Sequence, residues 1–300
     1  MSENIEPSAL YSVIDQCAQL VGVTSSRDTV WPILTAYQDT LAQAVIAFRV
    51  ATGESNAGDF DCRFTMLPRQ LDPYAVALSE NLIAPTDHPV GDLLRELHGE
   101  FPIDGTGIDF GVVGGFKKTW SFFPIDDLQS VSKLVGLPSM PESVAGNLDF
   151  FTRHDLTDRV SLVGIDYPHR SVNLYFGGAP AEVFSADGIT SILREAGLAR
   201  PSDRLLRLGA RAFGIYATMS WDSPKVERIT IAAMTSDPMT LPVPIEPKIE
   251  NLVRKSPYST EDRQFVYAIT TTPAGEYHKL QSYFKWQSRV RNVLLVSQDG

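Results

Sequence analysis

Several strand-like stretches of this chain carry a cationic residue among apolar and aromatic neighbours. These cations are Arg49, Arg63, Lys118, Arg228 and Lys279. A single Lys or Arg within a strand is commonly a surface residue whose stem covers apolar area, so each cation taken alone indicates little. Brought together, like charges repel unless an anion lies among them, and this group would suit an anion of about three charges. A diphosphate meets that requirement.

Polar and aromatic residues accompany these cations on the same strand faces. Side chains alternate between the two faces of a strand, so residues two positions apart lie together. By this rule Lys118 shares a face with Trp120 and Phe122, whereas the adjacent Lys117 turns to the opposite face, toward helices or the rim. The rule gives further groups: Asp61 with Arg63, which could be a simple ion pair, Asn173 with Tyr175, Gly214 with Tyr216, Arg228 with Ala232 and Met234, and Lys279 with Gln281 and Tyr283.

Motifs for other chemistries are missing from the sequence. There is no GxxxxGK[ST] loop, and the glycines of "GVVGGF" lie between two strands and open no helix, so a nucleotide is a poor candidate for the anion. Cys17 and Cys62 lack CxxC spacing and a histidine pattern, which argues against a zinc site or a disulfide framework. We expect both to be buried free thiols.

The elements that must position the cations recur along the chain. Pairs of alternating segments follow one another about every fifty residues, and each pair predicts a β-hairpin. The pairs cover 44–52 with 59–67, 105–113 with 115–123, 159–167 with 170–178, 211–221 with 225–234, and 263–272 with 275–284. Turns this short join antiparallel strands, and ten such strands close best as a barrel, which leaves no free edge. A barrel of this size can hold a ligand.

Helical patterns separate the hairpins and flank the whole array. They cover 7–23, 26–43, 73–82, 90–101, 126–136, 142–154, 186–197, 202–210, 245–255 and 285–296. The order is therefore five αββα repeats, which predicts an α+β fold: a ten-stranded antiparallel barrel with its helices outside, as one domain over residues 1–300.

Composition limits the classes of partner. The 300 residues are 43% hydrophobic and 21% charged, as in ordinary globular chains, and the net charge of −10 argues against general binding of nucleic acid or acidic membranes. The N-terminal stretch "MSENIEPSAL" is polar and no long apolar run occurs, so we expect a cytoplasmic protein.

Several of these stretches resemble the ABBA aromatic prenyltransferases, in their bacterial branch. The resemblance is carried by "GGFKKTWSFFP", "DYPHRSVNLYF", "SWDSPKVERI" and "GEYHKLQSYF", and further by "TAYQDTLAQ", "DPYA", "DHPVGDLL" and "LPSMP". It covers nearly the whole chain. Within the branch, "FRVATG", "DLQS" and "PVPIEPKIE" look most like the members that modify phenazines. The resemblance implies a barrel of αββα repeats, called the PT-barrel, and Friedel–Crafts transfer of a dimethylallyl or geranyl group from its diphosphate to a carbon of an electron-rich aromatic ring.

The resemblance also implies roles for particular residues. It places Lys118, Asn173, Arg228 and Lys279 around the diphosphate, and Tyr175 and Tyr216 where they bind the diphosphate and shield the carbocation. Lys118, Tyr175 and Tyr216 are then the catalytic residues. His169 stands where a relative carries lysine, which makes it a further candidate contact. The expected acceptor site comprises Trp120, Phe122, Ser161, Val163, Phe213, Gly214, Ala232, Met234, Gln281 and Tyr283.

The resemblance bears on metal use too. Relatives that need magnesium keep a carboxylate at the position of Asp61 but have small hydroxyl residues where Arg49 and Arg63 stand here. A guanidinium beside Asp61 can neutralise that carboxylate and also reach the phosphates. We therefore expect turnover without magnesium, without any other cofactor, and in a monomer. The group that removes the ring proton stays open, because Glu276 lies near Lys279 but parity turns it outward.

Two alternatives remain beside the enzyme. The barrel could bind or carry an aromatic or prenylated metabolite without turnover, using the same cations. A protein-binding module would need an exposed apolar face that no segment indicates. The expected partners are an allylic diphosphate and an aromatic small molecule. The length of the prenyl chain, the acceptor and the alkylated carbon are not determined by these residues.

Overall fold

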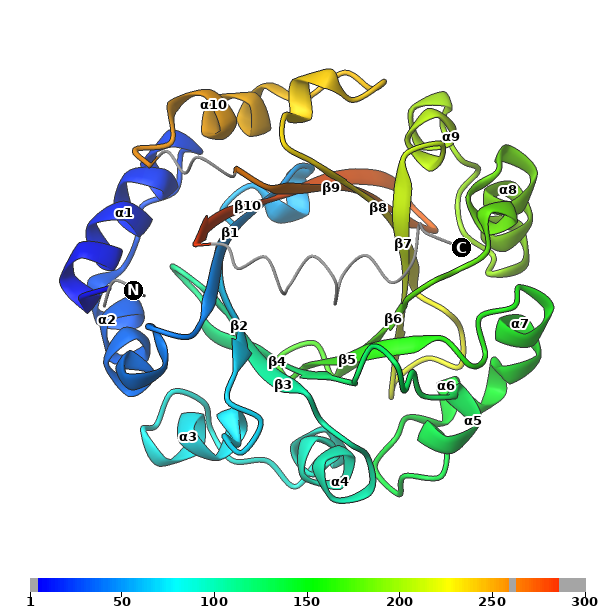
Figure 1. Cartoon of the computed structure of the whole chain (residues 1–300), viewed down its shortest axis with the longest axis horizontal. Helices are drawn as coiled ribbons and strands as arrows, with labels where there is room; N and C mark the ends of the chain where they lie inside the picture. Colours follow the sequence, from blue (N-terminus) through cyan, green and yellow to red (C-terminus); the bar gives the residue numbers. More distant parts are fainter. Residues whose placement is uncertain (1–4, 259–262, 286–300) are drawn as a thin grey trace.

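A computed structural model describes residues 5–258 and 263–285 of the chain, and its centre is a closed β-barrel. Each strand pairs antiparallel with both neighbours, and the barrel closes through the pairing of β1 with β10 (Figure 1). The strands are β1 Val45–Ala51, β2 Phe60–Leu67, β3 Gly105–Gly111, β4 Gly115–Phe122, β5 Val160–Asp166, β6 Ser171–Phe176, β7 Ala212–Ser220, β8 Arg228–Thr235, β9 Phe265–Thr272 and β10 Gly275–Lys285. The expected antiparallel barrel is confirmed.

Helices surround the barrel on its outside, as Figure 1 shows in the view down the barrel. They are α1 Pro7–Leu20, α2 Arg27–Ala36, α3 Pro73–Ser79, α4 Leu93–Glu100, α5 Val131–Leu134, α6 Glu142–Gly146, α7 Leu148–Arg153, α8 Ala186–Glu195, α9 Asp203–Gly209 and α10 Pro247–Lys255. None of the helices in the described ranges is long and apolar enough to cross a membrane.

Capping side chains stabilise the N-terminal ends of several of these helices. Asp72 accepts the backbone N–H groups of Tyr74 and Ala75 at the start of α3, and Ser202 does the same for Leu205 at the start of α9. Such caps satisfy amide groups that have no partner within the helix. The Glu276 carboxylate of β10 holds Ser202 in turn, through its backbone N–H at 2.8 Å and its hydroxyl at 2.5 Å. Glu276 therefore lies outside the barrel, as strand parity predicts.

Some helix predictions are wrong in their extent. The pattern over 142–154 is divided into α6 and α7, and the pattern over 126–136 yields only the short α5. The pattern over 26–43 ends its α-helix at Ala36 and continues as a 3-10 turn, Gln38–Thr40. The prediction for 285–296 falls almost wholly outside the described residues.

Apolar side chains form two separate clusters, one on each side of the barrel wall. The larger lies between strands and helices and contains Phe48, Phe64 and Phe110. Cys17 and Cys62 are buried there as free thiols, as expected, and burial raises the pKa of Cys17 to about 12. The smaller cluster is inside the barrel: Val45, Ala47, Met66, Trp120, Phe122, Leu162 and Tyr283. These few apolar side chains fill only part of the lumen.

Bulges interrupt the alternation of several strands. In the β3–β4 pair Asp109 opposes Lys118 and Phe110 opposes Phe116, so Lys117 is an extra residue in β4. In the β5–β6 pair Val160 opposes Phe176 and Leu162 opposes Tyr175, so Ser161 is an extra residue in β5. A bulge leaves one residue unpaired and turns the flanking side chains away from strict alternation.

Candidate active site

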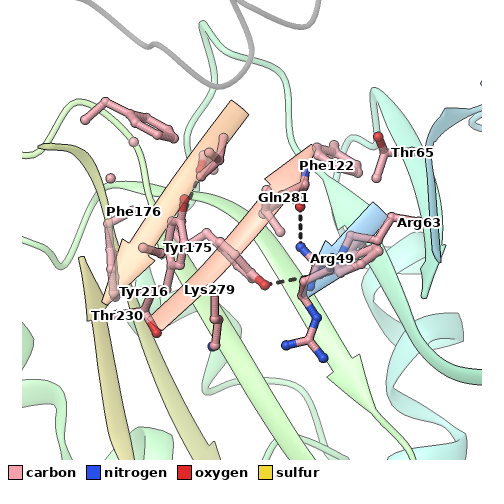
Figure 2. Close-up of a pocket in the computed structure, with 18 of the residues that line it drawn as sticks. Arg49, Arg63, Thr65, Phe122, Tyr175, Phe176, Tyr216, Thr230, Lys279 and Gln281 are labelled. Carbon is pink, nitrogen blue, oxygen red and sulfur yellow. Dashed lines mark hydrogen bonds between the residues drawn. The ribbon is translucent and has the colours of Figure 1, made fainter. Parts of the chain in front are cut away.

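The lumen contains a cavity of about 990 Å³, a volume that includes its open mouth. The cavity opens to solvent at its mouth, so a small molecule can enter the barrel. Cationic and aromatic side chains line it; in Figure 2, Lys279 and Arg49 lie toward its lower end, and Phe122 and Thr65 toward its upper end. The lining residues are Arg49, Arg63, Thr65, Trp120, Phe122, Ser161, Leu162, Tyr175, Phe176, Gly177, Phe213, Gly214, Tyr216, Thr230, Val266, Ala268, Lys279, Gln281 and Tyr283.

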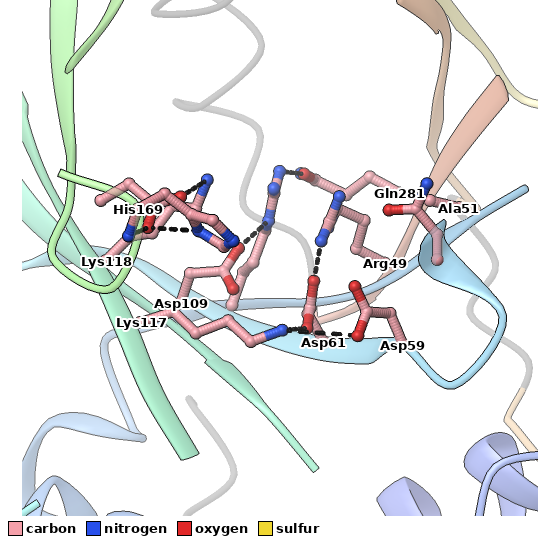
Figure 3. Close-up of polar contacts among 12 residues, drawn as sticks. Arg49, Ala51, Asp59, Asp61, Asp109, Lys117, Lys118, His169 and Gln281 are labelled. Carbon is pink, nitrogen blue, oxygen red and sulfur yellow. Dashed lines mark hydrogen bonds and ion pairs between the residues drawn. The ribbon is translucent and has the colours of Figure 1, made fainter. Parts of the chain in front are cut away.

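Three buried aspartates hold cations of the lumen in fixed positions. Arg49 and Lys117 both bind Asp61, and Lys117 does so at 2.8 Å (Figure 3). The other two pairs are Arg63 with Asp109, at 2.8 Å, and Lys118 with Asp166, at 2.6 Å. Each aspartate side chain is at most 1% exposed, so each carboxylate must keep its cation to stay ionised.

Lys117 joins the charged group from the rim of the barrel. It does not line the cavity, and its ammonium group lies 3.9 Å from the partly exposed Asp59 as well as 2.8 Å from the Asp61 carboxylate that Arg49 also binds. The bulge in β4 permits this position, because the extra residue ends the alternation between Lys117 and Lys118. Asp61 and Arg63 share a strand face but do not form an ion pair with each other. Asp61 pairs with Arg49 and Lys117, whereas Arg63 pairs with Asp109.

The electrostatics of Asp61 follow from these contacts. Burial would raise the pKa of a lone carboxyl, but Arg49 and Lys117 outweigh that effect and lower the pKa of Asp61 to about 2. At Asp166 burial is likewise outweighed, here by Lys118 and by His169, so the pKa of this carboxyl is well below its usual value. Both groups are therefore anionic at neutral pH.

His169 lies at the turn between β5 and β6. Its Nδ1 is 2.9 Å from Oδ1 of Asp166, and its side chain is 68% exposed. His169 therefore touches the Asp166 carboxylate that Lys118 binds, but it does not line the cavity. It stands at the rim of the cation group.

Lys279 differs from Arg49, Arg63 and Lys118 because no carboxylate pairs with it within the described ranges. Its ammonium group lies 5.0 Å from the centre of the Tyr277 ring. Burial, and then repulsion from Arg49, Arg228, Lys118 and Arg63, hold the pKa of Lys279 well below its usual value. Cationic side chains of β1, β2, β4 and β8 therefore lie near Lys279 of β10. An anion site needs such a group of cations.

A row of polar groups crosses β6, β7 and β8 beside these cations. Asn173 opposes Thr218, and Thr218 opposes Arg228. The Thr218 hydroxyl donates to Oδ1 of Asn173 at 2.7 Å, and the buried Nδ2 group of Asn173 has no hydrogen-bond partner among the described residues. A buried amide donor without a partner costs stability, so it suggests a missing acceptor.

Aromatic rings stand above the cations. Tyr175 and Tyr216 are cross-strand partners whose ring centres are 4.3 Å apart, and both line the cavity. Trp120 donates from Nε1 to the Tyr175 hydroxyl at 3.4 Å, and the Arg63 guanidinium lies 4.9 Å from the indole centre. Burial raises the pKa of Tyr216, so its hydroxyl stays protonated and can donate a hydrogen bond.

Most of the residues expected around the acceptor lie on the lumen wall. Those that line the cavity are Trp120, Phe122, Ser161, Phe213, Gly214, Gln281 and Tyr283. Ala232 opposes Gly214 and Ala268, and Met234 opposes Val266, so register places both on the same face as lining residues.

The prediction that Val163 lines the acceptor site is wrong. It is fully buried in the outer cluster and opposes Ser121, whose hydroxyl contacts His98 of α4. The bulge at Ser161 shifts the alternation of β5, so Leu162 replaces Val163 inside the barrel. No feature of the isolated strand marks that bulge.

Sequence reasoning missed several residues. Asp109 and Asp166 oppose Lys118 on its two sides. The register of the β3–β4 hairpin could have suggested Asp109 once the bulge in β4 was allowed for, whereas Asp166 depends on the pairing of β4 with β5. Phe176, Val266 and Ala268 are apolar strand residues with no distinguishing signal. Among the described residues, no group of three or more His, Cys, Asp or Glu side chains is arranged to hold a metal ion.

Comparison with known proteins identifies the family of this chain. The sequence model of the family "Aromatic prenyltransferase Orf2" matches residues 6–293. The chain is 59% identical to 5,10-dihydrophenazine-1-carboxylate 9-dimethylallyltransferase of Streptomyces anulatus, over 98% of both chains. It is 46% identical to the furaquinocin biosynthesis prenyltransferase of Streptomyces sp. strain KO-3988, over 98% of this chain and 96% of the relative. It is 43% identical to flaviolin linalyltransferase of Streptomyces virginiae, over 97% and 96%. The chain therefore belongs to the Orf2 family of aromatic prenyltransferases.

Proposed function

We propose that this prenyltransferase moves a dimethylallyl group from its diphosphate to a ring carbon of a dihydrophenazine carboxylate. The observation that carries the proposal is that Arg49, Arg63 and Lys279 line one end of a mainly apolar and aromatic lumen, with Lys118 and Arg228 near enough to lower the pKa of Lys279. The donor and acceptor classes follow those named for the Streptomyces anulatus relative, which matches nearly the whole chain at 59% identity.

The cations would bind the diphosphate of the donor. With Lys117 counted, six cations outnumber the four carboxylates that pair with them, Asp59, Asp61, Asp109 and Asp166, and this excess of positive charge suits an anionic diphosphate. The orphan Nδ2 of Asn173 would gain a phosphate oxygen as its acceptor. Lys118 would release part of its bond to Asp166 to reach the same group.

Ionisation of the donor is the step that these cations favour. As the C–O bond breaks, its electron pair stays on the diphosphate, so charge grows where cations are already in place. The allylic carbocation is then flanked by Tyr175, Tyr216 and Trp120, whose rings can each stabilise it by roughly 0.5–2 kcal/mol and keep water away. An acceptor ring carbon donates an electron pair to form the new C–C bond, and the ring proton leaves to water or diphosphate.

Magnesium should not be needed for this ionisation. Both oxygens of Asp61 bind cations, one Arg49 and one Lys117, and these cations would repel a magnesium ion at this carboxylate. The same two cations supply positive charge beside the phosphate site. We propose, too, that the chain forms a single domain and works as a monomer, since the strands of this one chain enclose the cavity.

The test is a mass-spectrometric assay of product and of pyrophosphate in the presence of EDTA. Dimethylallyl and geranyl diphosphate are each offered with 5,10-dihydrophenazine-1-carboxylate, kept reduced without oxygen, with flaviolin and with 4-hydroxybenzoate. We expect product from dimethylallyl diphosphate and the dihydrophenazine, and pyrophosphate only when both substrates are present. Saturable binding of both compounds without turnover would instead identify a carrier, and product from another pair would overturn the substrate assignment.

A further inference from the structure

Trp120 lies between two glycines in the barrel wall. Its cross-strand partners are Gly107 in β3 and Gly164 in β5, and both are in register with it. Neither glycine has a positive φ, so backbone conformation does not require glycine at either position. Space is the remaining physical reason for the absence of a side chain.

The space at Gly164 is occupied by the indole itself. A Cβ atom placed on Gly164 would lie 2.7 Å from Nε1 and 2.8 Å from Cδ1 of Trp120, closer than non-bonded atoms approach. At Gly107 a Cβ would lie 3.1 Å from Cε3 of the same ring. The indole therefore lies against the backbone of both neighbouring strands instead of standing up into the lumen.

The lumen side of the indole faces the reacting region. The Arg63 guanidinium lies over the ring, and the Tyr175 hydroxyl accepts from Nε1. Trp120 thus lies between the cationic part of the lumen wall and the apolar part, which includes Phe122. Any lift of the indole from the wall would narrow the lumen at this level.

We propose that Gly164 is a specificity-determining residue, because it lets Trp120 lie flat against the barrel wall and so gives the lumen the width that an acceptor of three fused rings needs. The inference rests on the proposed function, since it takes the lumen as the place where the acceptor lies. Gly164 itself touches no reacting atom in this scheme and acts through the indole.

Substitution of Gly164 by alanine tests the inference. The added Cβ must push the indole inward, because the backbone of β5 cannot move without breaking its pairing to β4 and β6. We expect Gly164→Ala to lower kcat/KM about tenfold or more for dihydrophenazine carboxylate, but about threefold or less for a two-ring dihydroxynaphthalene, since one added methylene in a pocket discriminates on that scale. Gly99→Ala, on a helix with open space around its Cα, is the matched control.

A double variant separates width from a general loss of folding. In Gly164→Ala/Trp120→Phe the smaller ring can tilt away from the new methyl group, so the double variant should be no worse on the three-ring acceptor than Trp120→Phe alone. Near-ultraviolet circular dichroism gives a readout apart from activity: Gly164→Ala should change the indole signal, and this change should disappear in the Trp120→Phe background. Thermal unfolding of each variant shows whether the barrel is intact.

The outcomes are distinguishable from those of the proposed function. If the unmodified enzyme prenylates no fused-ring acceptor, the proposed function fails first. If it does so and Gly164→Ala keeps the same ratio of three-ring to two-ring activity, Gly164 does not set the width and this inference is overturned. Additive losses in the double variant would also overturn it, because the two positions would then act independently.

Discussion

The ammonium nitrogen of Lys117 lies 2.8 Å from Oδ1 of Asp61, while Arg49 binds the other oxygen of the same carboxylate. The two cations reach Asp61 from different strands, β4 and β1, so one buried anion ties together two elements that are distant in the sequence (Figure 3). Burial would lower the pKa of Lys117, but Asp61 raises it above its usual value, and the ammonium stays charged. Lys117 thus binds the charged group of the lumen from the rim, where it also faces Asp59.

This relationship predicts different effects for the two adjacent lysines. Lys118→Ala should lower kcat/KM for the donor about a hundredfold or more, because the diphosphate loses a cation that it would contact directly. Lys117→Ala should cost about 1–3 kcal/mol of stability and raise the donor KM about three- to tenfold, because Asp61 then draws Arg49 more strongly away from the phosphate. Steady-state kinetics and urea unfolding measure both. A Lys118→Ala enzyme with near-normal rates would refute the assignment of the diphosphate site.

Removal of metal ions should leave activity unchanged. Arg49 and Lys117 occupy the Asp61 carboxylate, so EDTA takes nothing from the site. Rates are compared in EDTA alone and in EDTA with excess magnesium, and equal rates are expected. Arg49→Ser frees one oxygen of Asp61 and is expected to lose activity that magnesium partly restores. Loss of activity of the unmodified enzyme in EDTA, reversed by magnesium, would show that the guanidinium does not replace the metal.

Asn173 gives a test of the orphan amide donor. Asn173→Asp replaces Nδ2 by an acceptor oxygen at a position that opposes Thr218 and faces the cations. A carboxylate cannot donate to a phosphate and repels it, so the donor KM should rise at least about tenfold. Thr218→Val serves as the control, since it removes only the bond that orients the amide and should have a smaller effect. Equal donor affinity in Asn173→Asp and the unmodified enzyme would contradict the contact.

Lys279 should make donor binding depend on pH. Its pKa is depressed by burial and by the neighbouring cations, and a bound diphosphate would raise it, so binding takes up a proton between the two pKa values. Affinity for inorganic pyrophosphate should therefore fall as pH rises through that window. Calorimetry in two buffers of different ionisation enthalpy measures the uptake, and Lys279→Arg, which stays charged, should abolish it. Unchanged proton uptake in Lys279→Arg would assign it to another group.

The same depressed pKa of Lys279 predicts that the free energy of unfolding changes with pH in the opposite direction to donor affinity. The folded state releases the Lys279 proton more readily than the unfolded state, so the unfolded state binds more protons between the two pKa values and unfolding free energy rises with pH there. Lys279→Met removes the buried charge and should raise the melting temperature near neutral pH while abolishing turnover. A lower melting temperature would show that Lys279 contributes packing that outweighs its charge.

Asp61 should stabilise the fold above the usual carboxyl pKa and lose that contribution as pH falls toward about 2. Asp61→Asn leaves Arg49 and Lys117 without a counterion in a buried place, which should cost about 3–5 kcal/mol at neutral pH. Urea unfolding at pH 7, 4 and 2.5 measures the cost. The difference between variant and unmodified protein should shrink at the lowest pH, and a constant difference would contradict the role of ionised Asp61.

The barrel and the set of cations could be predicted from the residues alone. Alternation within each hairpin specifies antiparallel strands, since it depends on short-range geometry that each segment carries alone. The fifty-residue period then gives the number of hairpins. The same alternation placed Trp120, Tyr175, Tyr216 and Gln281 on the face that lines the lumen. Where strands keep their period of two, the residue types suffice to assign their faces.

The pairing of individual charged residues depends on how the strands fit together in the barrel. The bulges at Lys117 and Ser161 arise from the fit of β4 and β5 to their neighbours in a closed barrel, and they brought Lys117 to Asp61 and exchanged Val163 for Leu162. Asp109 and Asp166 became counterions because register set them on both sides of the Lys118 position. Closure of a barrel fixes stagger and tilt for all strands at once, so these contacts depend on long-range pairing that no single segment encodes.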